Sequence, residues 1–308
     1  MTMLVSTNLF FDRTNRQLGG LTADVQKLQT QLATGKRLTT ASDDAAAFRR
    51  VQRLEIAGAN DAAWRNNITL ASSVLDQADA TLGNITDLLQ RAQELAVQSN
   101  SGTLSDSDRR VVASQLRGVI DDVLTLANTR DGRGIPLFGA ATGDAALVRD
   151  ASGTVSFGGT GDPPSIPVGD DTVVRPSESA ERIFGGLPVA GGGTTDIFAE
   201  ISSLAAALDV PGGASVPAIA ANTIDQLKAA VEQVVSVRGS IGARSARLDL
   251  EQSRLDDLNV IREADRGALE GTDMQATIIQ LQKTSTILQA TQMSLSRLSQ
   301  LSLFDYLR

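Results

Sequence analysis

The feature that most constrains this chain is a heptad pattern of small and apolar residues that runs from Leu54 to Ala96 and is interrupted only by Asp61. Such a pattern places one continuous stripe along one side of an α-helix. It predicts a single helix over about residues 43 to 99, roughly 80 Å long at the standard rise per residue. That length is typical of a rod and not of an ordinary globular domain.

Shorter stripes with the same spacing lie near each end of the chain, and each predicts a helical arm of about 50 Å. Neither arm has a globular core of its own, and long solitary helices are marginal in water. We therefore expect the arms to pack against each other and against the arms of neighbouring copies. The stripe residues predicted to do this are Leu18, Leu21, Val25, Leu28 and Leu32 before Gly35, and Leu281, Leu288, Leu295 and Leu298 after Gly271.

Two glycines mark predicted joints where an arm meets the rest of the chain. Gly35 follows the first arm, as glycine commonly does at a helix C-terminus, and Lys36 and Arg37 are placed to favour the negative end of that helix. The stretch from Ser42 to Asp44 predicts an N-cap for the next helix. Gly271 ends a long helix, and residues 272–275 match a capping box that opens the last arm.

Between these joints the pattern changes twice. A third helix is predicted over about residues 105–130, and clusters of Gly and Pro with β-prone pieces ("GTVSFGG", "DTVVRP") then predict a small β-rich segment. A helix over 197–208 follows. A capping-box pattern at residues 223–226 predicts the start of a helix that continues to about residue 268.

The predicted fold is mainly α with a small β insertion, consisting of a long antiparallel helical rod, terminal coiled-coil arms and an outer β-rich domain. We expect five segments in chain order. They are an N-terminal arm and joint (1–41), rod helices (42–130), the outer β-rich domain (131–195), a helix and the C-terminal rod helix (196–270), and a C-terminal arm (271–308).

The amino-acid composition disfavours several classes of function. The chain has no Cys and no His, so the commonest catalytic acid/base, the thiolate nucleophile and Cys-type zinc sites are all missing. We expect no enzymatic activity, no metal and no cofactor. The net charge of −8 disfavours a nucleic-acid role. No apolar run is long enough to insert in a membrane, and the first residues do not form a cleavable secretion signal.

Several motifs resemble those of the flagellin superfamily. They are "LATGKR…SDDAAA" around Gly35, "RAQELAVQSN" at residues 91–100, and "MSLSRLSQLSLFDYLR" at residues 293–308. "ANTRDGRGIPLFGA" and "ERIFGG" resemble the sequences that flank the β domain in the hook–filament junction branch. Ala45 and Ile135-Pro136 depart from the pattern of that branch, so a filament flagellin stays an alternative.

The resemblance implies a structural subunit of the bacterial flagellum that connects hook to filament through its terminal helices. It implies a ring of copies of this chain, with another hook-associated protein on the hook side and flagellin on the filament side. It also implies an export chaperone for the C-terminal arm, and secretion through the flagellar type III apparatus without a cleaved signal. Two other readings remain open from the residues alone: carboxylate chemistry housed in residues 131–193, and a cytoplasmic coiled-coil scaffold.

Overall fold

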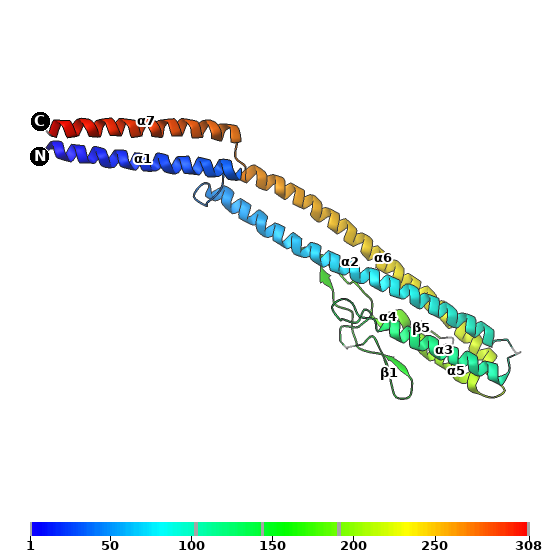
Figure 1. Ribbon diagram of the computed structural model, residues 1–308. Coiled ribbons are helices and arrows are strands. Elements are labelled where there is room, and N and C mark those ends of the chain that lie inside the picture. Colours follow the sequence, from blue (N-terminus) through cyan, green and yellow to red (C-terminus); the bar gives the residue numbers. More distant parts are fainter. Residues whose placement is uncertain (1, 102–103, 143–144, 190–191, 307–308) are drawn as a thin grey trace. The chain divides into compact units, whose positions relative to one another are not determined.

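The computed structural model describes residues 2–101, 104–142, 145–189 and 192–306. Within these ranges the chain is dominated by long helices, with a few short strands between α3 and α5 (Figure 1). The predicted mainly α fold with a small strand-containing insertion is confirmed. The helices are α1 (Thr2–Thr34), α2 (Ala45–Ser99), α3 (Asp106–Ala127), α4 (Ala180–Phe184), α5 (Ile197–Asp209), α6 (Val216–Glu270) and α7 (Met274–Tyr306).

The chain divides into two compact units. The first contains residues 1–60 and 257–308, and the second contains residues 61–256. Helices α2 and α6 each contribute residues to both units.

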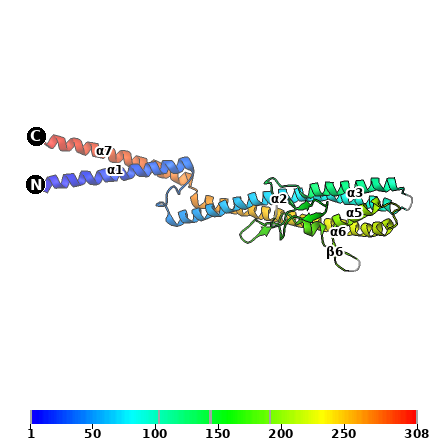
Figure 2. The same cartoon turned by 90° about the horizontal axis from the view of Figure 1, so that it is seen from below.

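In the first unit, α1 and α7 lie side by side and run in opposite directions, as both views show (Figures 1 and 2). The start of α2 and the end of α6 form a second helix pair. A small core joins this pair to the connector after α1, in which buried Leu38 packs with Ala47 and Val51 of α2 and with half-buried Leu269 of α6.

In the second unit, α2, α3, α5 and α6 bury one apolar face each in a common core. The predicted heptad stripe of α2 provides much of this core, since Leu75, Ala78, Leu82, Ile85 and Leu89 are all fully buried. Helix α6 is tied to α2 at its polar edge as well, because the guanidinium of Arg238 donates hydrogen bonds of 2.8 and 3.1 Å to the carboxylate of Asp79.

The strands form three separate antiparallel pairs. They are β1 (Leu147–Arg149) with β2 (Val155–Phe157), β3 (Ile166–Pro167) with β4 (Val173–Val174), and β5 (Leu187–Pro188) with β6 (Thr194–Thr195). Strands β2 and β4 fall within the two predicted strand segments. Isolated pairs this short have little stability alone, so their side chains must pack on something larger.

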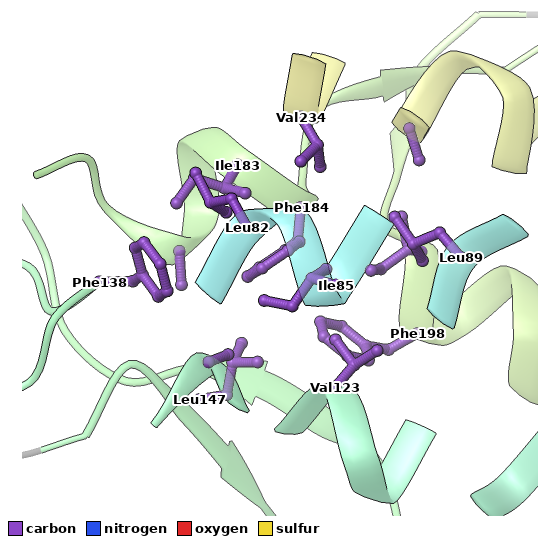
Figure 3. Close-up of a cluster of buried hydrophobic side chains, with 14 of the residues drawn as sticks. Leu82, Ile85, Leu89, Val123, Phe138, Leu147, Ile183, Phe184, Phe198 and Val234 are labelled. Atoms are coloured by element: carbon purple, nitrogen blue, oxygen red, sulfur yellow. The ribbon is translucent and has the colours of Figure 1, made fainter. Parts of the chain in front are cut away.

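That larger partner is the helical core (Figure 3). Phe138, Leu147, Ile183 and Phe184 of the insertion are buried in the same cluster as Leu82, Ile85, Val123, Phe198 and Val234 of the helices. The rings of Phe184 and Phe198 meet edge to face, with centroids 5.9 Å apart. The insertion therefore shares one hydrophobic core with the helices around it.

A buried ion pair also fastens the insertion to α6. Arg244 pairs with Glu178, whose side chain is only 5% exposed, and its Nη1 donates to the carbonyl oxygens of Arg175 at 3.0 Å and Ser177 at 3.3 Å. Arg182 approaches the other oxygen of Glu178 at 3.6 Å. The carboxylate is thus buried with its charge compensated.

The expected start of the long C-terminal helix at Thr223 is wrong. Helix α6 begins at Val216, and Pro217 occupies its first turn, where its missing N–H costs nothing. Thr223 lies inside the helix with its side chain fully buried, so its hydroxyl caps no helix end.

Candidate assembly site

The paired arms form the most distinctive surface of the first unit. The described leucines and valine of the stripes of α1 and α7 are all half-buried. This burial follows from the geometry, since a pair of helices covers each stripe from one side only. The residues in question are Leu18, Leu21, Val25, Leu28, Leu32, Leu281, Leu288 and Leu295. The side chain of Leu298 lies outside the described residues.

Helix α7 exposes further apolar side chains beside its stripe. Ile279 is 67% exposed and Met293 is 60% exposed, and Met274, Ile278 and Ile287 are exposed as well. Thr277, at a stripe position, is buried. A two-helix pair with half-covered stripes and exposed Ile and Met side chains can accept additional helices, and burial of those side chains would favour their addition.

Both predicted joints lie in this unit, and the structure brings them into contact. Gly35 ends α1 with φ +67°, and its N–H donates to the carbonyl oxygen of Gln31 at 2.8 Å. That left-handed conformation favours glycine. Gly271 follows α6, and its N–H donates to the carbonyl oxygen of Gly267 at 2.8 Å.

An antiparallel bridge links the two joints, with Lys36 opposite Gly271. The N–H of Arg37 donates to the carbonyl oxygen of Glu270 at 2.5 Å, and the N–H of Thr272 donates to the carbonyl oxygen of Gly35 at 3.0 Å. An ion pair of 2.8 Å between Lys36 Nζ and Glu270 Oε2 reinforces the bridge. The connector that follows α1 and the connector that follows α6 are therefore held together by backbone hydrogen bonds and an ion pair.

The basic pair after Gly35 acts on a different helix from the one expected. Lys36 and Arg37 were predicted to favour the carboxyl end of the first arm. Instead, Arg37 serves the carboxyl end of α6, where its guanidinium donates to the carbonyl oxygen of Leu269 at 3.2 Å. The last carbonyl groups of any helix lack partners within that helix. The first connector supplies them here.

The two carboxylates in the acidic stretch before α2 have different partners. Asp44 is the N-cap, since its Oδ1 accepts from the N–H groups of Ala46 at 3.1 Å and Ala47 at 3.0 Å. Asp43 instead accepts from the N–H groups of Thr39 and Thr40, both at 2.9 Å, and pairs with Lys27 Nζ at 2.7 Å.

These contacts lower the pKa values of both carboxyl groups. The ammonium of Lys27, and then the N–H groups of Thr39 and Thr40, hold the pKa of Asp43 well below its usual range. The N–H of Ala47 is the main cause of the lowered pKa of Asp44. Both groups are therefore charged at neutral pH, and Asp43 anchors the connector to the last turns of α1.

The N-cap of the last arm lies one residue later than the expected one, Thr272. Asp273 caps α7, because its Oδ1 accepts from the N–H of Ala276 at 3.0 Å. The hydroxyl of Thr272 lies 3.0 Å from the hydroxyl of Thr277.

Several residues of this site were not singled out from the sequence. They are Lys27, Leu38, Glu270 and Gln31, whose Nε2 donates to the carbonyl oxygen of Arg37 at 3.1 Å. Their partners lie in the connectors, beyond any local pattern. The available sequence signal for such a contact was the polar side chain of Gln31, one position before a stripe leucine.

Within the described ranges, no group of three or more His, Cys, Asp or Glu side chains could hold a metal ion. The helices in those ranges include none with the length and hydropathy of a bilayer-spanning segment.

Two protein-family models match the chain. The bacterial flagellin N-terminal helical region matches residues 5–142, and the bacterial flagellin C-terminal helical region matches residues 224–307. These ranges contain both joints and all but the outermost residues of both arms.

Individual relatives are similar along nearly the whole chain. The flagellar hook-associated protein 3 of Escherichia coli K12 is 29% identical over 98% of this chain and 99% of its own length. The flagellin of Listeria monocytogenes is 28% identical over 97% of this chain and 95% of its own length. The crystal structure of the flagellar junction protein FlgL from Legionella pneumophila superposes with a TM-score of 0.57 at 16% identity, covering 72% of this chain and all of that one. That likeness shows a shared fold.

Proposed function

Because the chain belongs to the flagellin superfamily, we propose that it is the structural subunit of the bacterial flagellum that connects the hook to the filament. The observation that carries this proposal is the full-length similarity to a flagellar hook-associated protein 3.

The connection is made by packing of the terminal helices. In a single copy the stripes of α1 and α7 are covered from one side only. Neighbouring copies cover the other side, and completing the burial of each leucine adds about 1 kcal/mol. The inter-subunit residues are Leu18, Leu21, Val25, Leu28, Leu32, Leu281, Leu288, Leu295 and Leu298.

The joints at Gly35 and Gly271 connect the arm pair to α2 and α6 within the first unit. The bridge between Lys36 and Gly271 makes the two connectors one element. Both arms therefore enter the assembly together, as a preformed pair. The five segments predicted from the sequence, 1–41, 42–130, 131–195, 196–270 and 271–308, then act as arm, rod, insertion, rod and arm.

The partners follow from this role. Copies of the chain form a ring, which contacts another hook-associated protein on the hook side and flagellin on the filament side. Before export, a chaperone covers the apolar side chains of the C-terminal arm. The chain leaves the cell through the flagellar type III apparatus without a cleaved signal peptide. It performs no catalysis, it binds no cofactor or nucleic acid, and it does not insert in a membrane.

A filament flagellin is the second candidate. The observation that favours it is the similarity to the Listeria flagellin, which also extends over nearly the whole chain. The two candidates differ in how far assembly proceeds. A filament subunit polymerises into long tubes, whereas a junction subunit stops at a ring.

Gold-labelled antibody against this chain tests the proposal on intact flagella. We expect label confined to a band between hook and filament, and label along the whole filament would instead establish the flagellin role. In a deletion strain we expect hooks without filaments and unpolymerised flagellin in the medium. Cells that still build filaments without this chain would overturn the junction role.

A further inference from the structure

A surface outside the arms points to how neighbouring copies meet. It lies on the second helix pair of the first unit, residues 45–60 of α2 and 257–270 of α6. Ala47 and Val51 of α2 face inward with Leu269 of α6. Arg50 lies 4.0 Å from Asp265, which fixes the register of this antiparallel pair.

The opposite side of α2 carries a second stripe. Arg49, Arg53 and Ile56 are four and three positions apart, so they share one face of the helix. All three are exposed, and Ile56 is 63% exposed. In the described structure neither Arg49 nor Arg53 forms an ion pair, although Arg50 beside them does. This α2 outer face therefore presents two uncompensated positive charges next to an apolar side chain.

The side of α6 that faces away from α2 has the opposite character. Asp257, Val260, Ile261 and Ala264 share this α6 outer face. Val260 is 69% exposed and Ile261 is 58% exposed. Asp257 is exposed and has no ion pair among the residues that the structure describes.

The surrounding charge follows the same division. Residues 45–60 contain three Arg and one Glu, for a net charge of +2, and residues 257–270 contain four carboxylates and two Arg, for a net charge of −2. Two faces of opposite charge, each with an exposed apolar centre, are complementary.

The register places these apolar centres at the same height. Arg50 lies level with Asp265, and the helices are antiparallel. Ile56, six positions further along α2, therefore lies level with residues near position 259 of α6. Ile56 and Val260 thus point away from each other on opposite sides of the pair, at the same level. A second copy set alongside would bring its own Val260 towards Ile56.

We propose that the α2 outer face of one copy packs against the α6 outer face of a second copy of this chain. Ile56 then contacts Val260 and Ile261 of the neighbour, and Arg49 and Arg53 lie near its Asp257. The inference rests on the proposed function, which requires copies to assemble side by side, and it adds the surfaces that do so.

The contact is head to tail. A symmetric dimer through either face would place like charges opposite each other, Arg against Arg or Asp against Asp. A contact between two different faces leaves one face free on each end of the pair, so it propagates, and it gives a ring when the rotation between copies closes and an open helical filament when it does not.

Charge reversal in the full-length protein tests the proposal. We expect Arg49→Glu with Arg53→Glu to weaken self-association, measured by sedimentation of concentrated protein, by about tenfold or more, and Asp257→Arg to do the same. A one-to-one mixture of the two variants should assemble again, because every α2 outer face then meets an α6 outer face of opposite charge. Arg110→Glu, at an exposed arginine of α3 without an ion pair in the described structure, is the matched control and should assemble as the wild type does.

Cross-linking gives a second readout, since the chain contains no cysteine. Cells that co-express Ile56→Cys and Val260→Cys chains should yield dimers with a short bismaleimide, whereas each variant alone should not. Ile56→Cys with Val235→Cys, at a position 51% exposed elsewhere on α6, is the control.

The two readouts separate this proposal from the proposed function. Antibody label away from the junction, with charge-dependent association intact, would reject the junction role alone. The proposed contact is overturned if the charge-reversed variants assemble like the wild type, if the mixture assembles no better than its components, or if assembled flagella give no Ile56–Val260 cross-link.

Discussion

The guanidinium of Arg37 donates a hydrogen bond to the carbonyl oxygen of Leu269, 3.2 Å away, and so joins positions 232 residues apart in the sequence. This contact belongs to the bridge that unites the two connectors. The bridge depends on backbone geometry at two glycines and on a few charged side chains, and these residues provide direct tests.

Replacing Gly35 with Ala should destabilise the joint by about 1–2 kcal/mol, because its φ of +67° places a Cβ in a strained position. Gly19→Ala is the matched control. Gly19 lies inside α1, and a methyl group added there would meet open space, so Ala should stabilise the helix by up to about 1 kcal/mol. Amide exchange at Arg37 and Thr272 measures the difference, and equal effects of the two substitutions would contradict the assignment of Gly35 as the joint.

Gly271→Ala should loosen the same bridge for a different reason. A Cβ at Gly271 would lie 2.6 Å from the carbonyl oxygen of Gly267, so the backbone must shift, at a cost of about 1–3 kcal/mol. Gly267→Ala meets nothing within 4 Å and serves as the control. Faster exchange of the Thr272 amide only in the first variant is the expected result. Unchanged exchange there would show that the bridge tolerates a side chain.

The lowered pKa of Asp43 predicts a specific pH dependence. A carboxyl group whose pKa is lowered in the folded state contributes stability above its unfolded pKa of about 3.9, and this contribution is lost as the pH falls through the folded value. Wild type should therefore exceed Asp43→Asn in free energy of unfolding at pH 7, and the gap should shrink below about pH 3.9. Urea unfolding measures both values. Glu55→Gln, at an exposed carboxylate in the same unit, controls for the loss of a charge, and a gap that is constant with pH would refute the prediction.

Leu288→Asp should abolish assembly while leaving the isolated chain folded. A charge in the stripe of α7 faces α1 and, in an assembly, the neighbouring arms, where an unpaired charge is costly to bury. Gln289→Asp introduces the same residue at the adjacent exposed position and should assemble normally. Motility and sedimentation report assembly, and far-UV circular dichroism reports the helices. Normal assembly by Leu288→Asp would remove the stripe from the interface.

Arg244→Ala should be among the most destabilising single changes in the second unit, by about 3 kcal/mol, because it strands the buried carboxylate of Glu178. Arg247→Ala, one turn further along α6 at an exposed position, should change stability little. Thermal unfolding of both variants gives the comparison. Similar melting temperatures would mean that Arg182 alone compensates Glu178.

The elements with long periodic patterns were predictable from the sequence. The stripe between Leu54 and Ala96 located α2 to within two residues at either end, and Gly35 located the end of α1. The small strands were only partly predictable, because two or three residues carry too little periodicity. The start of α6 was predicted at the wrong residue because Thr223 carries a local capping pattern but is buried inside the helix by tertiary packing. The bridge between Lys36 and Gly271 was beyond reach, since no local pattern specifies a partner so distant.

The long sequence separation between Lys36 and Gly271 determines when the bridge can form during folding. Closing so long a loop in an unfolded chain is entropically unfavourable until the helices between have formed. The N-terminal helix, although synthesised first, must wait for the end of translation to find its place. The joint that holds the two extremities together is therefore one of the last contacts that the folding chain can make.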